Sequence, residues 1–321
     1  MTATLPAEVQ KVFDRFITTE YTTIDRRGRP ITWPVTPYYS PGDPCIDVTT
    51  GLGYPKKARD AQANPKVALL FSDPTGSTLE SPPQVLVQGT AEVDERDLAR
   101  NRERYTRESL EKLPGARSML PPKPLRRAFD WYYTRIYVHV RPERVYVWPG
   151  GDPRREPQLL DAHMEEVRSG HDEEPEAPGP PTEGGEPAWD PRMDELGHHY
   201  RSAVLSLVAP DGFPFSVRVP IAVDHEARTV RLAAEPVGAP LARGLACLTA
   251  HDHHPEFKWQ RNFQIRGDLV RDGPGWALVP HRLIGGFELP PSSMLERYRL
   301  NARKMLRFRR IAKKELSRRP D

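Results

Sequence analysis

The chain has 321 residues, 36 prolines, a mean hydropathy of −0.65 and a formal net charge of +3. This length predicts two domains of ordinary size, and no apolar run of about 18 residues is present to span a membrane. The N-terminus lacks the pattern of a secretion signal, and the two cysteines do not form a disulfide framework. We therefore expect a cytoplasmic protein, and the many prolines argue against a mostly helical one.

The first half of the chain predicts short strands separated by glycine and proline turns. Two apolar strands flank Gly28 in "TTIDRRGRPITWPVT", and "CIDVTT" follows at residues 45–50. After a polar stretch come the apolar strands "VALLF" at 67–71 and "QVLVQGTAEV" at 84–93. Residues 94–113 carry charges at i, i+4 spacing, which predicts a helix. Short β-branched strands of this kind are typical of a barrel or a sandwich.

Charge divides the rest of the chain. Residues 151–190 hold twelve acidic residues and three arginines, net −9, and their Pro/Gly/Glu composition predicts a flexible linker. Residues 292–321 hold eleven Lys or Arg and three acids, net +8. Their apolar residues recur at helical spacing, which predicts a basic C-terminal helix packed on the barrel. A surface for nucleic acid is the less favoured interpretation of this tail.

The two sides of the linker are similar at a fixed offset. Gly28 and Pro30 correspond to Gly212 and Pro214, and "CIDVTT" corresponds to "TVRLAA", both at an offset of 184. "VALLF" corresponds to "LACLT" at 245–249, and Gly89 to Gly267, at an offset of 178. A constant offset that changes once is typical of an internal repeat. We therefore predict two copies of one β-rich domain, residues 1–150 and 191–291.

The six residues lost between the two offsets lie in one segment. The first copy has sixteen residues there, "GLGYPKKARDAQANPK" at 51–66, and the second has ten at 235–244. A solvated helix face is the ordinary explanation for Lys56, Lys57 and Arg59. However, Thr49 and Thr50 end the preceding strand, and hydroxyls, cations and a helix N-terminus together favour a phosphate group.

This segment resembles the cofactor segment of the pyridoxamine 5′-phosphate oxidase-like superfamily, the FMN-binding split β-barrels, and that of their deazaflavin-dependent relatives. The family pattern is a strand ending in Thr or Ser, a Lys/Arg turn, a short helix ending at Asn-Pro, and an apolar strand. All four parts stand in order in "CIDVTTGLGYPKKARDAQANPKVALLF", and "QVLVQG" at 84–89 resembles a second family motif. The resemblance covers both copies at the level of the fold, but the cofactor motif occurs only in the first.

The resemblance implies a mainly β fold with flanking helices, in which two tandem split β-barrels form an internal pseudo-dimer. It implies that the cofactor lies between the repeats, one per chain, and that the second site is degenerate. The residues implied to bind it are Thr36, Thr49, Thr50, Lys56, Lys57, Arg59 and Gln84. We expect a monomeric pseudo-dimer or a homodimer.

The function implied is that of an oxidoreductase which transfers hydride to or from a small organic substrate. The cofactor is FMN or a deazaflavin, coenzyme F-420, and no catalytic residue is identified. The alternatives are a non-catalytic protein that binds such a cofactor or haem, and a nucleic-acid binder. His251, His253 and His254 are interpreted as part of a polar loop, because no further metal-ligand motif accompanies them.

Overall fold

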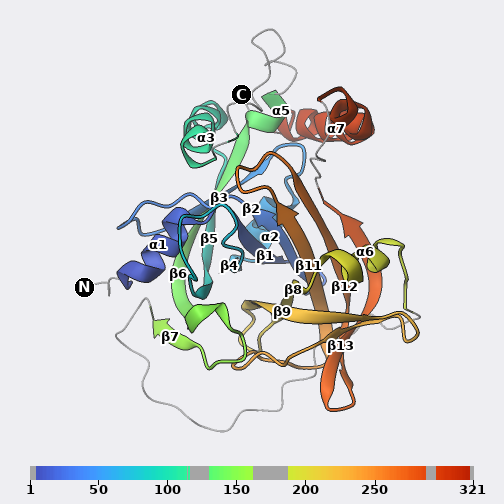
Figure 1. Cartoon of the computed structure of the whole chain (residues 1–321). Coiled ribbons are helices and arrows are strands. Elements are labelled where there is room, and N and C mark those ends of the chain that lie inside the picture. The colour runs from blue at the N-terminus through green and yellow to red at the C-terminus, as the bar shows by residue number, and fades with distance from the viewer. Residues whose placement is uncertain (1–4, 114, 116–129, 162–186, 287–293, 319–321) are drawn as a thin grey trace.

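The computed structural model describes residues 5–113, 115, 130–161, 187–286 and 294–318. Two sheets lie side by side, and helices lie at their edges (Figure 1). The first sheet has seven strands, and the second closes into a six-stranded barrel. The prediction of a mainly β protein with flanking helices is therefore confirmed, with one barrel and one open sheet.

The first sheet is formed by the N-terminal half of the chain. Its strand order is β2-β1-β4-β5-β6-β3, and β7 pairs with β6. Its strands are β1 (Thr19–Ile24), β2 (Pro30–Val35), β3 (Ile46–Gly51), β4 (Lys66–Phe71), β5 (Gln84–Asp94), β6 (Arg135–Trp148) and β7 (Gln158–Asp161). The strand β7 lies inside the predicted linker, so the sheet continues beyond residue 150.

The barrel is formed by the C-terminal half. Its order is β9-β8-β11-β12-β13-β10, with β10 also paired to β9. Its strands are β8 (Ser202–Val208), β9 (Pro214–Asp224), β10 (Thr229–Leu232), β11 (Gly244–His253), β12 (Gln260–Asp272) and β13 (Gly275–Gly285). When each strand is matched to its equivalent in the first half, the two orders are the same.

Closure is what distinguishes the two halves. In the barrel, β9 continues to Asp224 and pairs with β10 over four residues. In the first sheet, β2 ends at Val35. The residues that follow it pair with β3 through an isolated bridge between Tyr38 and Asp47. Pro34 and Pro37 flank the end of β2 and have no N–H to donate to a neighbouring strand. The first sheet is therefore split where the barrel is closed.

Both halves contain the same irregularity. The register of β5 and β6 shifts between Gln88 and Gly89, and that of β12 and β13 between Arg266 and Gly267. A Cβ on Gly89 would lie 2.2 Å from the Arg141 carbonyl oxygen, and a Cβ on Gly267 would lie 2.0 Å from that of Val279. Glycine is required at both bulges because the partner strand leaves no room for a side chain.

The two sheets pack along a surface that we call the seam. The strand β2 packs against β8, β11 and β12, and the equivalent strand β9 packs against β1, β4 and β5. Four buried hydroxyls form a closed ring across it, with neighbours 2.7–2.9 Å apart: Thr22, Thr32, Ser206 and Ser216. Thr22 and Ser206, and Thr32 and Ser216, are equivalent positions, so the ring has approximate twofold symmetry.

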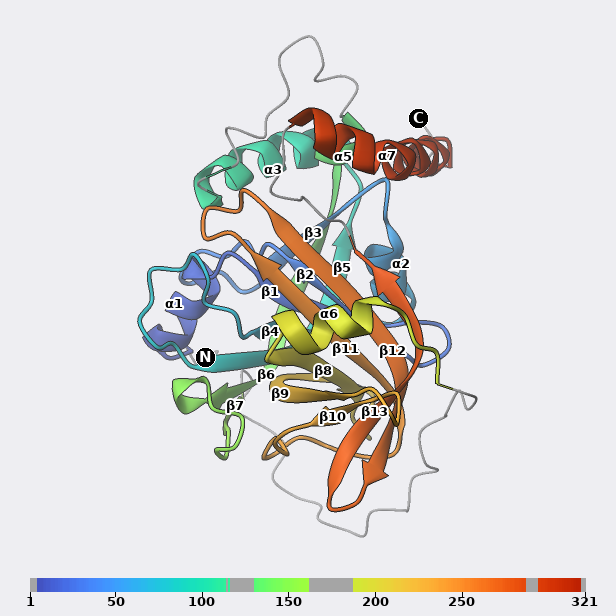
Figure 2. The same cartoon turned by 45° about the vertical axis from the view of Figure 1, so that its right-hand side comes forward.

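The apolar core follows from strand alternation. In β4, Val67, Leu69 and Phe71 face the core of the first sheet, whereas Ala68 and Leu70 belong to the cluster that fills the barrel. Because both faces of β4 are buried, its sequence is an unbroken apolar run. The helix α1 (Ala7–Arg15) covers the first core, and α6 (Arg192–His199) lies against the barrel (Figure 2).

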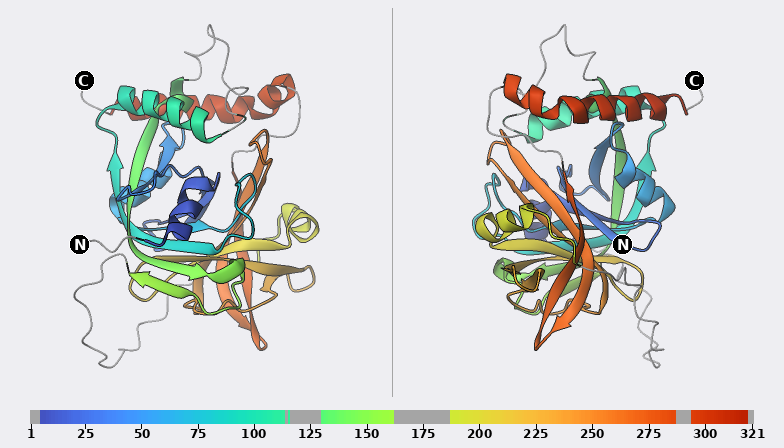
Figure 3. Two further views of the ribbon diagram at one scale, coloured as in Figure 1. Left: turned by 60° about the vertical axis from the view of Figure 1, so that its left-hand side comes forward. Right: turned by 90° about the vertical axis from the view of Figure 1, so that its right-hand side faces the viewer.

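The helices α3 (Leu98–Lys112), α5 (Asp130–Tyr133) and α7 (Met294–Leu316) lie at one end of the first sheet (Figure 1). The helix α2 (Lys56–Ala63) packs against β1, β5 and β6, and the 3-10 helix η2 (Pro149–Gly151) follows β6. The predictions of a helix at 94–113 and of a C-terminal helix are confirmed, and α3 and α7 lie across the same end of the molecule (Figure 3). Among the described residues, no helix combines the length and the apolarity needed to cross a membrane.

Candidate cofactor site

The segment between β3 and β4 folds as the sequence predicts. The Thr50 side chain is buried, and its hydroxyl donates to the Tyr54 carbonyl oxygen at 2.8 Å, which closes the turn into α2. Thr49 is half-buried at the end of β3, opposite Tyr137. The helix ends before Asn64-Pro65, because a residue before proline avoids the helical conformation. Both threonines therefore lie beside the start of α2.

The three cations of this segment have different surroundings. The Lys56 Nζ lies 2.7 Å from a carboxylate oxygen of Asp60, one turn along the helix. The Arg59 guanidinium forms ion pairs with Glu95 at 2.7 Å and with Glu315 at 2.6 Å. These charges are satisfied within the protein, so we revise the prediction that Lys56 and Arg59 bind a phosphate group. Arg59 instead connects α2 to α7.

Lys57 is the exception. Its side chain is half-buried, and its Nζ lies 5.6 Å from the centre of the Tyr54 ring. Burial, together with the nearby charge of Arg135, lowers the pKa of Lys57 to about 8. Within the described part of the chain, no carboxylate lies within ion-pair distance of Lys57 or Arg135. The half-buried Lys57 and the buried Arg135 are therefore neighbouring cations without a carboxylate partner among the described residues.

Arg135 is enclosed by tyrosines. It is 4% exposed, and its two terminal nitrogens donate to the hydroxyls of Tyr54 at 2.6 Å and Tyr105 at 2.7 Å. Its guanidinium lies 4.2 Å from the Tyr105 ring centre and 4.4 Å from that of Tyr132. Its Nε is buried and has no hydrogen-bond partner among the described residues. A buried charge without a counter-ion is costly, so this donor set fits an anionic group.

The helix α7 covers this end of the sheet. The Phe308 ring packs against Tyr54 with ring centres 5.4 Å apart, and Ala312 is fully buried in the first core. The Glu315 side chain is buried and holds Arg59. The C-terminal helix therefore packs on the first sheet, and α7 lies at the same end of the molecule as α3 and α5 (Figures 1 and 3).

Gln84 lies elsewhere. Thr50 pairs with Ile136 near the start of β6, whereas Gln84 pairs with Trp148 at its end. The Gln84 side-chain oxygen accepts a hydrogen bond of 2.9 Å from the backbone N–H of Arg218 in the barrel. The structure therefore does not bring Gln84 to Lys57. The equivalent position in the second half is Asn262, on β12.

Thr36 and Asn262 lie in different surroundings. Thr36 follows β2 and is half-buried. The ring of Tyr38, two residues later, packs against that of Tyr105, with ring centres 6.3 Å apart. A Cβ on Gly286 would touch both the Asn262 side chain and the Trp33 ring, so these two side chains meet at Gly286. Asn262 of the barrel thus contacts the first half, just as Gln84 of the first half contacts the barrel.

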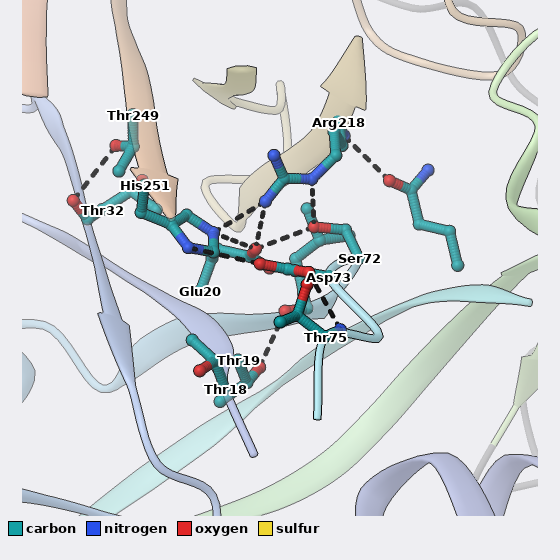
Figure 4. Close-up of polar contacts among 12 residues, drawn as sticks. Thr18, Thr19, Glu20, Thr32, Ser72, Asp73, Thr75, Arg218, Thr249 and His251 are labelled. Atoms are coloured by element: carbon teal, nitrogen blue, oxygen red, sulfur yellow. Dashed lines mark hydrogen bonds and ion pairs between the residues drawn. The ribbon is translucent and has the colours of Figure 1, made fainter. Parts of the chain in front are cut away.

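Arg218, which Gln84 contacts, belongs to a buried polar network at the seam with Glu20, Ser72 and His251 (Figure 4). Arg218 donates to Ser72 at 2.9 Å and forms an ion pair with Glu20 at 2.8 Å. Glu20 is fully buried, and its Oε1 lies 2.6 Å from the Nε2 of His251. Burial opposes ionisation of Glu20, but the His251 hydrogen bond and the Arg218 charge outweigh it and lower the pKa of Glu20. These contacts join the two halves.

Two of the three histidines that were predicted to lie in a polar loop lie elsewhere. His251 and His253 are buried at the end of β11 and do not belong to a polar loop. The Nε2 of His253 lies 3.0 Å from the Thr18 hydroxyl. Among the residues that the structure describes, no group of three His, Cys, Asp or Glu side chains is arranged to hold a metal ion. These histidines belong to the seam.

Arg135 and its tyrosines were not identified from the sequence. Arg135 begins the strand "RIYVHV", and alternation places it with Tyr137 and His139 on the face opposite the apolar residues, so its burial is not visible in the sequence. Tyr54 lies within the predicted motif, three residues before Lys57. Tyr105 and Tyr132 come from α3 and α5, and their approach to Arg135 depends on tertiary packing that periodicity does not reveal.

Comparisons with known proteins give matches of fold over about half of the chain. No family model matches, and no curated protein matches. Among solved structures, a putative pyridoxamine 5′-phosphate oxidase from Listeria innocua is 14% identical with a TM-score of 0.30, covering 44% of this chain and 94% of its own. A structure named F420 reductase is 18% identical with a TM-score of 0.32, covering 44% and 98%.

A third match is HutZ, named as the haem storage protein of Vibrio cholerae. It is 17% identical with a TM-score of 0.31, and the alignment covers 46% of this chain and 99% of HutZ. In all three cases nearly the whole matched chain aligns with less than half of this one. These values report a partial similarity to solved structures and assign neither a ligand nor a reaction to this chain.

Proposed function

We propose that the chain binds a phosphate-bearing flavin or deazaflavin at the Lys57–Arg135 end of the first sheet and acts as an oxidoreductase on a small organic molecule. The observation that supports this most is the pair of cations without a carboxylate partner among the described residues. An anionic group placed between them would remove the cost of burying their charge. The order of motifs in residues 45–71 supports FMN or coenzyme F-420 as the source of that group.

Each residue would have a separate role. Lys57 and Arg135 would supply positive charge to a phosphate group, and the start of α2 would add backbone N–H groups. The Thr49 hydroxyl is available at the end of β3, whereas the Thr50 hydroxyl already holds the turn. The bound cofactor would supply hydride transfer at its ring system. The tyrosines and Phe308 would keep water from the phosphate end.

We further propose that the two halves are fused copies that form an internal pseudo-dimer with one cofactor. The matching strand orders, the paired bulges and the symmetric hydroxyl ring support the common origin. The barrel has no counterpart of α2 or of Lys57, because ten residues replace sixteen there. Its closed β9–β10 edge also occupies the position where the first sheet is split.

The test is a fluorescence titration of the purified full-length protein with FMN and, separately, with coenzyme F-420. We expect one of them to bind, and Lys57→Ala to weaken its affinity about 10- to 100-fold, as for loss of one charge-assisted hydrogen bond. Lys56→Ala is the matched control, because Lys56 is adjacent and already paired with Asp60. We expect it to change the affinity less than about threefold.

Equal effects of the two variants, or no binding of either cofactor, would contradict the proposed site. Catalysis is tested separately, by following anaerobic reduction of the bound cofactor with a reduced nicotinamide donor. Reduction followed by reoxidation with an added organic acceptor supports an oxidoreductase. Binding without either step would support the non-catalytic alternative.

A further inference from the structure

The outer face of β12 carries an unusual series of polar side chains. In "NFQIRGD" the apolar residues Phe263 and Ile265 point into the barrel core, and the alternate residues Gln264 and Arg266 face the first half. Both of these polar residues are buried, and Arg266 is 9% exposed. A polar face would not be buried against a neighbouring sheet unless its groups had partners.

Gln264 orients Arg266. The Gln264 amide nitrogen donates to the Thr32 carbonyl oxygen at 2.7 Å, across the seam. Its oxygen accepts a hydrogen bond of 2.7 Å from the Arg266 Nε. The fixed amide therefore holds the guanidinium in one orientation and leaves the two terminal nitrogens of Arg266 for another partner.

A second arginine lies directly across from the first. Arg266 and Arg282 are opposite each other in the β12–β13 ladder, at the bulge that precedes Gly267. Like charges at directly opposed positions destabilise a sheet, and bulges often redirect side chains at functional sites. Among the described residues, neither arginine lies within ion-pair distance of a carboxylate.

The neighbouring acids do not neutralise this pair. Asp25 is held by Arg29 through two hydrogen bonds, at 2.8 and 3.0 Å, and Asp60 is held by Lys56. Burial is the largest effect on Arg266 and lowers its pKa; the charges of Arg29 and Arg282 act in the same direction, and Cys247 and Asp25 act against it. The local charge therefore stays positive at the edge between β12–β13 and the β1–β2 hairpin.

We propose that Arg266 and Arg282 form an oxyanion-binding site that takes the carboxylate or phosphate group of a small molecule. Two arginines at opposed positions of the ladder, the buried Arg266 and the exposed Arg282, would each form charge-assisted hydrogen bonds with such a group. Binding would remove the repulsion between the two arginines. This site is separate from Lys57 and Arg135, and it does not depend on the proposed cofactor.

The experiment is calorimetric titration of the full-length Lys57→Gln protein, in which anion binding at the candidate cofactor site is weakened. Inorganic phosphate and succinate are titrated separately at a constant ionic strength set with potassium chloride. We expect at least one of them to bind, and its affinity to fall about 10-fold or more when Arg266→Gln or Arg282→Gln is added. The stronger of the two identifies the preferred class. Arg243→Gln, an exposed arginine of the same barrel, is the control and should leave the affinity unchanged.

A stability measurement separates binding from a structural role. Without phosphate or carboxylate in the buffer, Arg266→Gln should unfold at the same temperature as the parent protein or at a higher one, because it removes like-charge repulsion. Loss of all anion binding in Lys57→Gln alone would overturn the proposal. So would binding that is insensitive to Arg266→Gln, or a lowered unfolding temperature in that variant.

Discussion

The first sheet and the barrel have the same strand order but treat the connection between their third and fourth strands differently. In the barrel a short segment joins β10 to β11, and β10 closes the ring against β9. In the first sheet α2 occupies this connection, β2 ends early, and the edge stays open. The barrel shows that closure needs neither α2 nor Lys57. The extra helix and its unpaired cation are therefore better explained by a ligand than by folding.

The largest expected effect concerns a seam residue that differs between the halves. Glu20 corresponds to Val204, so Glu20→Val copies the second half into the first. The variant leaves the half-buried Arg218 and the buried His251 without the Glu20 carboxylate, and loss of one partner from a buried ion pair costs about 3 to 5 kcal/mol. Urea denaturation measures the free energy of unfolding.

The control for this change is Glu92→Val, because the Glu92 side chain is 72% exposed. We expect it to alter the free energy of unfolding by less than about 0.5 kcal/mol. If Glu20→Val also fell within this range, the seam charges would not hold the two halves together.

A smaller and symmetric effect is expected at the bulges. Gly89→Ala and Gly267→Ala should each lower the free energy of unfolding by about 1 to 3 kcal/mol, because each Cβ would overlap a carbonyl oxygen. Gly275→Ala is the control, since the nearest atom to its Cβ would be 3.8 Å away. A large effect at one bulge and none at the other would show that the matching bulges are not equivalent.

The smallest expected effect is a change of stability and of cofactor affinity with pH, which arises from Lys57 in the first half. Since the folded-state pKa of Lys57 is about 8 and its ordinary value is 10.5, the unfolded chain binds more protons between these values. The ligand-free protein should therefore gain stability as pH rises through this window. Cofactor affinity should instead fall as pH rises through about 8, because Lys57 loses its charge.

This affinity profile has an internal control. Burial also lowers the pKa of Lys112 to about 8, but Lys112 donates to the backbone of α1 and lies outside the candidate site. Fluorescence titrations at several pH values should show that Lys57→Met removes the decline above pH 8 and that Lys112→Met keeps it. The reverse result would assign the titration to another group.

Sequence patterns predicted those features that are local or repeated. The constant offsets indicated equivalent strands, and Gly89 and Gly267 marked the same bulge. Pro34 and Pro37 give a physical reason for the split edge. In place of the two predicted split barrels, the structure has an open sheet in the first half and a closed barrel in the second.

The site was less predictable because its contacts are distant in sequence. Arg59 was assigned to the phosphate group, yet its partner Glu315 lies 256 positions away on α7. Gln84 was assigned to the cofactor because "QVLVQG" resembles a family motif. The length of β6 separates Gln84 from the Lys57–Arg135 end, since a strand advances about 3.3 Å per residue. Arg135 has no local motif, and its role follows from the tyrosines packed around it.

The central claim is that one half of the chain binds the cofactor and the other does not. The most direct test is the number of cofactor molecules bound per chain, measured by absorbance and protein concentration after saturation and gel filtration. We predict one per chain in the parent protein and a loss of that molecule in Lys57→Ala. Two per chain, or one that remains in Lys57→Ala, would contradict the account.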